Sequence, residues 1–159
     1  MGEPLVKKGL IAFDFDQTII DANSDLVVID MIEGEVPEEA QKLYTEDNWT
    51  DYMQAIFKHL HVAGVKKKQF DDLLASLPFV RGLPALLKWL RESDYEIIII
   101  SDSNQYFIEH VLSTHALSQY VTEIFTNPAR FDDDGPLCIE WFHVQDSCNL
   151  STKNMCKGS

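Results

Sequence analysis

The sequence predicts an α/β protein: a doubly wound parallel sheet with a small helical segment inserted after the first strand. Residues 10–13 form a short apolar run of the kind found in buried strands, and residues 96–100 are almost wholly apolar and β-branched. Most of the chain between and after these runs has apolar residues at helical spacing. Strands that alternate with helical crossovers are typical of a parallel sheet.

The residues between the two predicted strands indicate helices. Pro37 and two acidic residues after it are typical of a first helical turn. Residues 49–61 carry six apolar side chains at helical spacing, and residues 70–77 carry four more. We expect these apolar stripes to pack in a core rather than to line a cofactor site. A solvated helix start is expected at residues 66–68, which are three lysines.

The second half of the chain predicts a helix, a strand, a helix, a strand and a hairpin. Leucines at positions 83, 86, 87 and 90 have the spacing of an amphipathic helix. A helix around residues 107–112 and a short strand at 124–126 follow the central strand. Asp134 and Gly135 indicate a hairpin turn between residues 129–131 and 137–141. These patterns divide the chain into an α/β part, residues 1–21 and 78–159, and a helical insertion, residues 22–77.

Composition and charge limit the class of protein. The chain has 159 residues, 45% of them hydrophobic and 25% charged, which fits one globular domain. A net charge of −13 argues against nucleic acid as a partner. There is neither a secretory signal at the start nor an apolar stretch of membrane-spanning length, so no membrane partner is expected. Three cysteines without an export signal predict reduced thiols and a cytoplasmic location.

Two carboxylates follow the first predicted strand. Asp14 and Asp16 are one residue apart, so on an extended backbone they point to the same side. Such a pair suits a hard divalent ion such as Mg²⁺, and its first carboxylate could act as a nucleophile toward a phosphoryl group. The alternative is a helix cap or a solvated turn. A second polar run, which begins at Ser101 at the end of the central strand, favours a phosphate site at this edge of the sheet.

Several short stretches together resemble the haloacid dehalogenase-like phosphatases, in the phospho-type branch of small-molecule phosphatases. Two relatives are similar: the pyridoxal phosphate phosphatases, which the central strand matches better, and the phosphoethanolamine/phosphocholine phosphatases. The matching stretches are residues 13–21, 23–25, 99–104, 125–128 and 154–157.

The resemblance implies a role for individual residues. Asp14 would be the nucleophile, and Asp16 the general acid and base, a role that a nearby like charge favours by raising the pKa of a carboxylate. Mg²⁺ would bind Asp14, the backbone carbonyl of Asp16 and the phosphate. Ser101, whose alternative role is a helix N-cap, would donate to the phosphoryl group, and Lys157 would offset its charge.

The resemblance also implies the substrate contacts and the role of the cap. Asp25 and Asp102 would contact the substrate, where a cationic amine would partner them. The helical insertion at residues 22–77 would be the family's small helical cap, which covers the site and selects a small phosphorylated metabolite. The alternative is a helical elaboration without a gating role.

The chain departs from the family pattern near its C-terminal end. Family members continue into a Gly-Asp-Gly-x-Asn-Asp motif that supplies a further Mg²⁺ ligand, and this sequence contains no match to it. The resemblance therefore implies a truncated form. It leaves open an active phosphatase, a non-catalytic binding partner, or an unstable fragment with an exposed sheet edge. A partial zinc site of His143, Cys148 and Cys156 is a further alternative.

Overall fold

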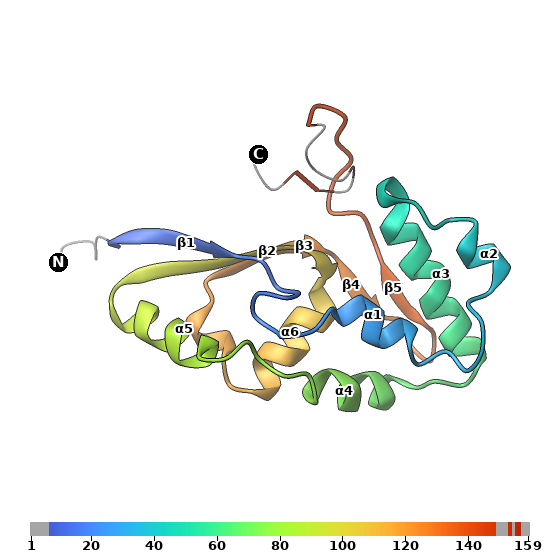
Figure 1. Cartoon of the computed structure of the whole chain (residues 1–159), viewed down its shortest axis with the longest axis horizontal. Coiled ribbons are helices and arrows are strands. Elements are labelled where there is room, and N and C mark those ends of the chain that lie inside the picture. The colour runs from blue at the N-terminus through green and yellow to red at the C-terminus, as the bar shows by residue number, and fades with distance from the viewer. Residues whose placement is uncertain (1–6, 149–152, 154, 157–159) are drawn as a thin grey trace.

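A parallel sheet forms the centre of the fold (Figure 1), in a computed structural model that describes residues 7–148, 153, 155 and 156. Its strands lie in the order β1–β2–β3, and both neighbouring pairs are parallel. The α/β prediction is confirmed. The three strands are β1 (Gly9–Phe13), β2 (Tyr95–Asn104) and β3 (Glu123–Asn127).

Two crossover helices cover one face of this sheet. Helix α5 (Leu83–Glu92) leads into β2, and helix α6 (Gln105–Thr114) leads from β2 to a short 3₁₀ turn, η2 (Ser118–Tyr120), and then β3. Both helices lie below the strands in Figure 1, as expected when right-handed crossovers proceed in one direction across a sheet. The fully buried residues between these layers include Leu87, Ile97, Ile99, Phe107 and Val111.

The chain between β1 and α5 is largely helical, as predicted. The residues expected to form a core stripe in this part, from Tyr52 to Leu60, are buried, whereas Trp49 at the start of the stripe is only partly buried. The proline-led helix is present but short, because it ends after one turn. The elements are α1 (Ser24–Ile29), α2 (Glu38–Gln41), η1 (Glu46–Asn48), α3 (Trp49–Val62) and α4 (Lys67–Ala75).

Helix α4 is attached to the core helix α6 by a polar cluster around Asp71. Its carboxylate accepts a hydrogen bond from Lys67 Nζ at 2.7 Å and another from the hydroxyl of Tyr106. Its backbone carbonyl lies 3.1 Å from His110 Nε2. Burial and the bond to Asp71 raise the pKa of Tyr106 to about 12. This cluster fixes the end of the helical segment against the sheet layer.

The predicted hairpin is present and packs on α3. Strands β4 (Ala129–Phe131) and β5 (Leu137–Ile139) are antiparallel, and β5 ends two residues before the expected boundary. Asp134 has φ of 55° in the turn, the left-handed conformation that Asp tolerates. Gln54 of α3 donates to the carbonyl of Leu137 at 3.2 Å and accepts from the backbone N–H of Ile139 at 2.8 Å. The hairpin therefore lies side by side with α3 (Figure 1).

Strand β1 lies at one edge of the sheet. Within the described residues it pairs only with β2, and its Leu10 is 61% exposed. An exposed edge of this kind belongs to the unstable-fragment alternative that the sequence left open. None of the helices in the described part of the chain combines the length and the apolar character needed to cross a membrane.

Candidate active site

The candidate site begins with a tight turn after β1. The carbonyl of Phe15 accepts a hydrogen bond from the backbone N–H of Ile19 at 2.8 Å, and both side chains are fully buried. Gln17 adopts φ of 59° within this turn. The buried Phe15 separates Asp14, which is exposed, from Asp16, which is half-buried. The sequence alternation therefore leaves both carboxylates at the carboxyl end of β1.

Backbone N–H groups hold one oxygen of each carboxylate. Asp14 Oδ1 accepts from Phe15 N at 2.8 Å, and Asp16 Oδ1 accepts from Ser24 N at 2.7 Å. Ser24 is the first residue of α1, so Asp16 satisfies one of the N–H groups that a helix leaves unpaired at its start. The capping alternative thus describes part of what Asp16 does. Its bond to Ser24 also fixes α1 beside the end of β1.

The end of β2 adds buried hydroxyls. The strand continues to Asn104, so Ser101 lies within it rather than at a helix start, and its hydroxyl accepts from Ser103 N at 3.2 Å. Asn104, not Ser101, caps α6 by accepting from Phe107 N at 3.0 Å. The N-cap alternative for Ser101 is therefore wrong. Ser103 Oγ lies 2.9 Å from Ser24 Oγ, and this bond joins β2 to α1.

Asn127 supports the backbone around these hydroxyls. It is fully buried at the end of β3, and its Nδ2 donates to the carbonyls of Asp102 at 2.8 Å and Ser103 at 2.9 Å. Its Oδ1 accepts from Phe142 N at 3.1 Å. Asp102 is half-buried beside it. The segment that carries Ser101 and Asp102 is consequently fixed by a side chain from the neighbouring strand.

Asp25 is a buried carboxylate in this cluster, only 5% exposed. Its Oδ2 accepts from Trp49 Nε1 at 2.6 Å, whereas its Oδ1 has no hydrogen-bond partner in the described part of the chain. Burial raises the pKa of Asp25 from 3.8 to about 7; the bond from Trp49 opposes this rise, and the charges of Asp16 and Asp102 add to it. A buried acceptor without a donor suits a ligand that brings a proton or a positive charge.

The side chains of the candidate site that could hold a metal ion are carboxylates, which offer oxygen ligands. Among the described residues no group of three His, Cys, Asp or Glu side chains is placed to hold a metal. The partial zinc site that the sequence left open as an alternative is thus not formed among these residues, and His143 Nε2 accepts from Cys156 N at 3.2 Å. Asp14 and Asp16 supply two carboxylates at one strand end, which fits Mg²⁺, an ion that usually binds one or two carboxylates and completes its shell with phosphate and water. Lys157 lies outside the described residues.

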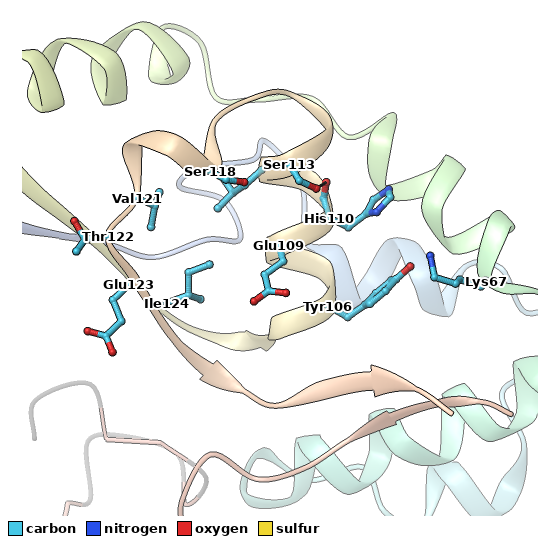
Figure 2. Close-up of a pocket in the computed structure, with 11 residues that line it drawn as sticks. Lys67, Tyr106, Glu109, His110, Ser113, Ser118, Val121, Thr122, Glu123 and Ile124 are labelled. Atoms are coloured by element: carbon cyan, nitrogen blue, oxygen red, sulfur yellow. Dashed lines mark hydrogen bonds between the residues drawn. The ribbon is translucent and has the colours of Figure 1, made fainter. Parts of the chain in front are cut away.

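A pocket of about 620 Å³ lies away from these carboxylates. Figure 2 shows Lys67, Tyr106 and His110 at one end of it and Thr122 and Ile124 at the other. Its walls come from α4, α6, η2, β3 and the residues between η2 and β3, and none of the predicted site residues lines it. Charge and hydrogen bonding at the strand ends, rather than the volume of this pocket, locate the candidate site.

Two residues of the candidate site, Ser103 and Trp49, were not predicted as such from the sequence. Ser103 follows Ser101 by two residues, so strand alternation could have placed both hydroxyls on one face. Trp49 was expected only as part of an apolar stripe, and no local pattern distinguishes an indole that reaches a carboxylate from one that packs in a core.

The fold is that of the haloacid dehalogenase-like hydrolases. A HAD family hydrolase from Salmonella enterica serovar Typhi superposes with a TM-score of 0.63 at 19% identity, over 85% of this chain and 45% of that one. A phosphoserine phosphatase solved as a phospho-aspartyl intermediate analogue has a TM-score of 0.56 at 19% identity, over 85% of this chain and 64% of that one. These likenesses show the fold.

Similarity in sequence defines the family of this chain more narrowly than the fold does. The family model described as "Putative Phosphatase" matches residues 9–159, and the chain belongs to that family. Pyridoxal phosphate phosphatase PHOSPHO2 of Mus musculus is 41% identical over 155 residues, which are 96% of this chain and 64% of the relative. Phosphoethanolamine/phosphocholine phosphatase of Homo sapiens is 33% identical over 151 residues, or 93% and 56%. Thiamine phosphate phosphatase-like protein of Arabidopsis thaliana is 34% identical over 155 residues, or 95% and 62%. The chain thus spans less than two thirds of the length of these relatives.

Proposed function

We propose that this chain is an Mg²⁺-dependent phosphatase that hydrolyses a small phosphomonoester carrying a cationic nitrogen, with pyridoxal 5′-phosphate favoured. The observation that carries the proposal is the convergence of carboxylates and hydroxyls from β1, β2 and α1. Ser24 links them, because its N–H bonds Asp16 and its hydroxyl bonds Ser103. Family membership supports the phosphoryl chemistry.

The reaction proceeds in two steps on Asp14. Its exposed carboxylate attacks phosphorus, the bond from phosphorus to the ester oxygen breaks, and the leaving alkoxide takes a proton from Asp16. Asp16 then removes a proton from water, whose oxygen attacks the aspartyl-phosphate and releases inorganic phosphate and free Asp14. Ser101 donates a hydrogen bond to the phosphoryl oxygens, and Lys157 offsets their charge. When bound, Mg²⁺ neutralises part of the phosphate charge; Asp14 and the backbone carbonyl of Asp16 would hold it.

The buried Asp25 favours a cationic substrate. It and Asp102 are the proposed contacts of the substrate, and Asp25 Oδ1 is a buried acceptor that lacks a donor among the described residues. The compounds in the names of the three relatives above have one chemical feature in common. Pyridoxal, ethanolamine or choline, and thiamine all carry a basic or quaternary nitrogen. A cation close to the phosphate would offset the repulsion among Asp16, Asp25 and Asp102.

The helical segment gives the proposed site its cover. We place a cap at residues 22–77, since α1 and α3 contribute Asp25 and Trp49 to the site while α4 is fixed to α6 through Asp71. A cover over the carboxylates would exclude bulk water from the aspartyl-phosphate. We expect the enzyme to act in the cytoplasm on small metabolites.

A phosphate-release assay with and without Mg²⁺ tests the proposal. Purified chain and its Asp14→Asn variant are incubated with pyridoxal 5′-phosphate, phosphoethanolamine, phosphocholine and an amine-free phosphomonoester. We expect Mg²⁺-dependent release by the wild-type chain and at least a hundredfold less by the variant, because the nucleophile is lost. Equal background release from both proteins rules out activity of this chain.

The same set of phosphomonoesters also tests two alternative functions. The human relative favours phosphoethanolamine or phosphocholine as the substrate, and the ranking of release rates decides between these and pyridoxal 5′-phosphate. The second alternative is a non-catalytic protein that binds phosphomonoesters or another protein. Binding of phosphomonoesters without turnover would support that second function.

A further inference from the structure

We propose that Trp49 is a positioning residue for substrate selection: its indole N–H holds one oxygen of Asp25 so that the other faces a cationic group on the substrate. The inference rests on the proposed function, since it concerns the same site. It adds a residue from α3 to the recognition of the cation. Trp49 acts through Asp25 and is not proposed to touch the reacting atoms.

The contact between the two side chains is short and joins separate elements. Trp49 Nε1 donates to Asp25 Oδ2 at 2.6 Å, and the residues are 24 positions apart in the chain. Trp49 is the first residue of α3, whereas Asp25 belongs to α1. A bond between an N–H and a carboxylate is among the stronger hydrogen bonds in proteins, and one such bond to a single oxygen restricts rotation of the whole carboxylate.

Neighbouring aromatic rings fix the indole. The ring of Trp49 lies 5.2 Å from that of Tyr52 and 5.8 Å from that of Tyr44, between ring centres. Tyr52 is 6% exposed, so the closer neighbour belongs to the core. The indole N–H therefore has a fixed direction, toward Asp25, before any ligand binds.

The second oxygen of Asp25, Oδ1, is the atom that a cationic group of the substrate would contact. Oδ1 is buried and has no donor among the described residues, while Asp16 and Asp102 face the same carboxylate as like charges. Trp49 supplies a hydrogen bond to this carboxylate but no positive charge. A substrate cation would supply both the missing donor and the missing charge, and it would meet Oδ1 in an orientation that Trp49 maintains.

A second indole in the chain provides a matched control. Trp141 Nε1 donates to Asp51 Oδ1 at 2.9 Å, but this bond is exposed and its carboxylate is not part of the site. Trp141→Phe thus removes the same kind of bond as Trp49→Phe. Any effect that is specific to recognition should follow Trp49 alone.

Binding is measured in the Asp14→Asn background, so that turnover is not required. Calorimetric titration compares phosphoethanolamine with n-propyl phosphate, in which a methyl group replaces the ammonium. We expect Trp49→Phe to weaken phosphoethanolamine binding about tenfold, the scale of one charge-assisted hydrogen bond, and to change n-propyl phosphate binding less than twofold. Trp141→Phe should change neither.

The outcomes separate this inference from the proposed function. If both ligands bind and Trp49→Phe weakens them equally or not at all, Trp49 has only a structural role and the inference fails. If neither ligand binds the Asp14→Asn chain and the wild-type chain also releases no phosphate from phosphoethanolamine, the proposed function fails and the inference fails with it.

A measurement without substitution of Trp49 guards against a variant that does not fold. The chain has three tryptophans, so the indole N–H signal of Trp49 in a proton–nitrogen NMR spectrum is assigned by elimination with Trp89→Phe and Trp141→Phe. We expect saturating phosphoethanolamine to shift this signal and n-propyl phosphate to leave it in place. An unmoved signal with phosphoethanolamine bound overturns the inference.

Discussion

Replacing Asp25 by Asn should stabilise the protein at neutral and alkaline pH. The Asn amide keeps an oxygen that can accept from Trp49 Nε1, and its NH₂ group takes the place of Oδ1 near Asp16 and Asp102. The substitution thus removes a buried charge while it preserves the shape and the existing hydrogen bond. It also removes the repulsion of Asp25 by Asp16 and Asp102.

The magnitude and the pH range follow from the pKa. Burial, opposed by Trp49 and increased by Asp16 and Asp102, raises the pKa of Asp25 from 3.8 in the unfolded chain to about 7 in the folded one. The folded state therefore holds the proton more tightly, and the stability that Asp25 contributes below pH 3.8 is lost as the pH rises through about 7. A difference of this size corresponds to about 4 kcal/mol, and relaxation around a buried charge brings the expected gain to about 2–4 kcal/mol at pH 8. Near pH 4 the gain should approach zero.

Urea unfolding at several pH values measures this difference. The free energy of unfolding of the wild-type chain and of Asp25→Asn is compared from pH 4 to pH 8, so that other titrating groups cancel to first order. Asp21→Asn, at an exposed position, removes the same formal charge without burial and serves as the control. A gain for Asp25→Asn that is the same at pH 4 and pH 8 would refute the reasoning.

Three further predictions concern the supports of the site and the core. Asn127→Ala should lower the free energy of unfolding by about 2–3 kcal/mol in urea, because the buried carbonyl of Ser103 and the part-buried carbonyl of Asp102 lose the bond from its amide; a loss no larger than that of an exposed Asn would contradict this. Leu87→Ala, at a fully buried position, should cost about 2–5 kcal/mol in the same assay, and a cost under about 1 kcal/mol would show that the site collapses freely. Asp71→Asn should lower the pKa of Tyr106 from about 12 toward 10.0, measured by NMR of ring-labelled tyrosine, and an unchanged pKa would assign the whole rise to burial.

The elements that could be predicted from the sequence are those whose side chains carry a strong periodic pattern. The leucine spacing of α5 is confirmed, since Leu83, Leu87 and Leu90 are buried and Leu86 is 40% exposed. Strand β2 was predicted only as far as its apolar residues, yet it continues to Asn104. Its polar end has no strand propensity of its own. The pairing with β3 is irregular between Ile100 and Asn104, and side-chain bonds from Asn127 to the carbonyls of Asp102 and Ser103 support this stretch.

The candidate site was predictable as a set of residue types but not as an environment. Asp14 and Asp16 follow directly from alternation after an apolar strand. The burial of Asp25 depends on α1 lying against β2, a contact made by Ser24 and Ser103, which are 79 positions apart. No local pattern encodes such a contact. The raised pKa of Asp25 therefore could not be predicted from the sequence.

The position of Asp25 links stability and recognition in a way that one substitution can expose. A buried carboxylate beside two others destabilises the folded chain at neutral pH, and a neutral group of the same shape would pack as well. A cationic ligand that meets Oδ1 removes this penalty, so part of its binding free energy comes from the repulsion it relieves. Asp25→Asn should consequently raise stability and abolish the preference for phosphoethanolamine over n-propyl phosphate together. If the stability rises while the preference remains, the cation is recognised elsewhere, and Asp25 is a structural acid rather than part of the substrate site.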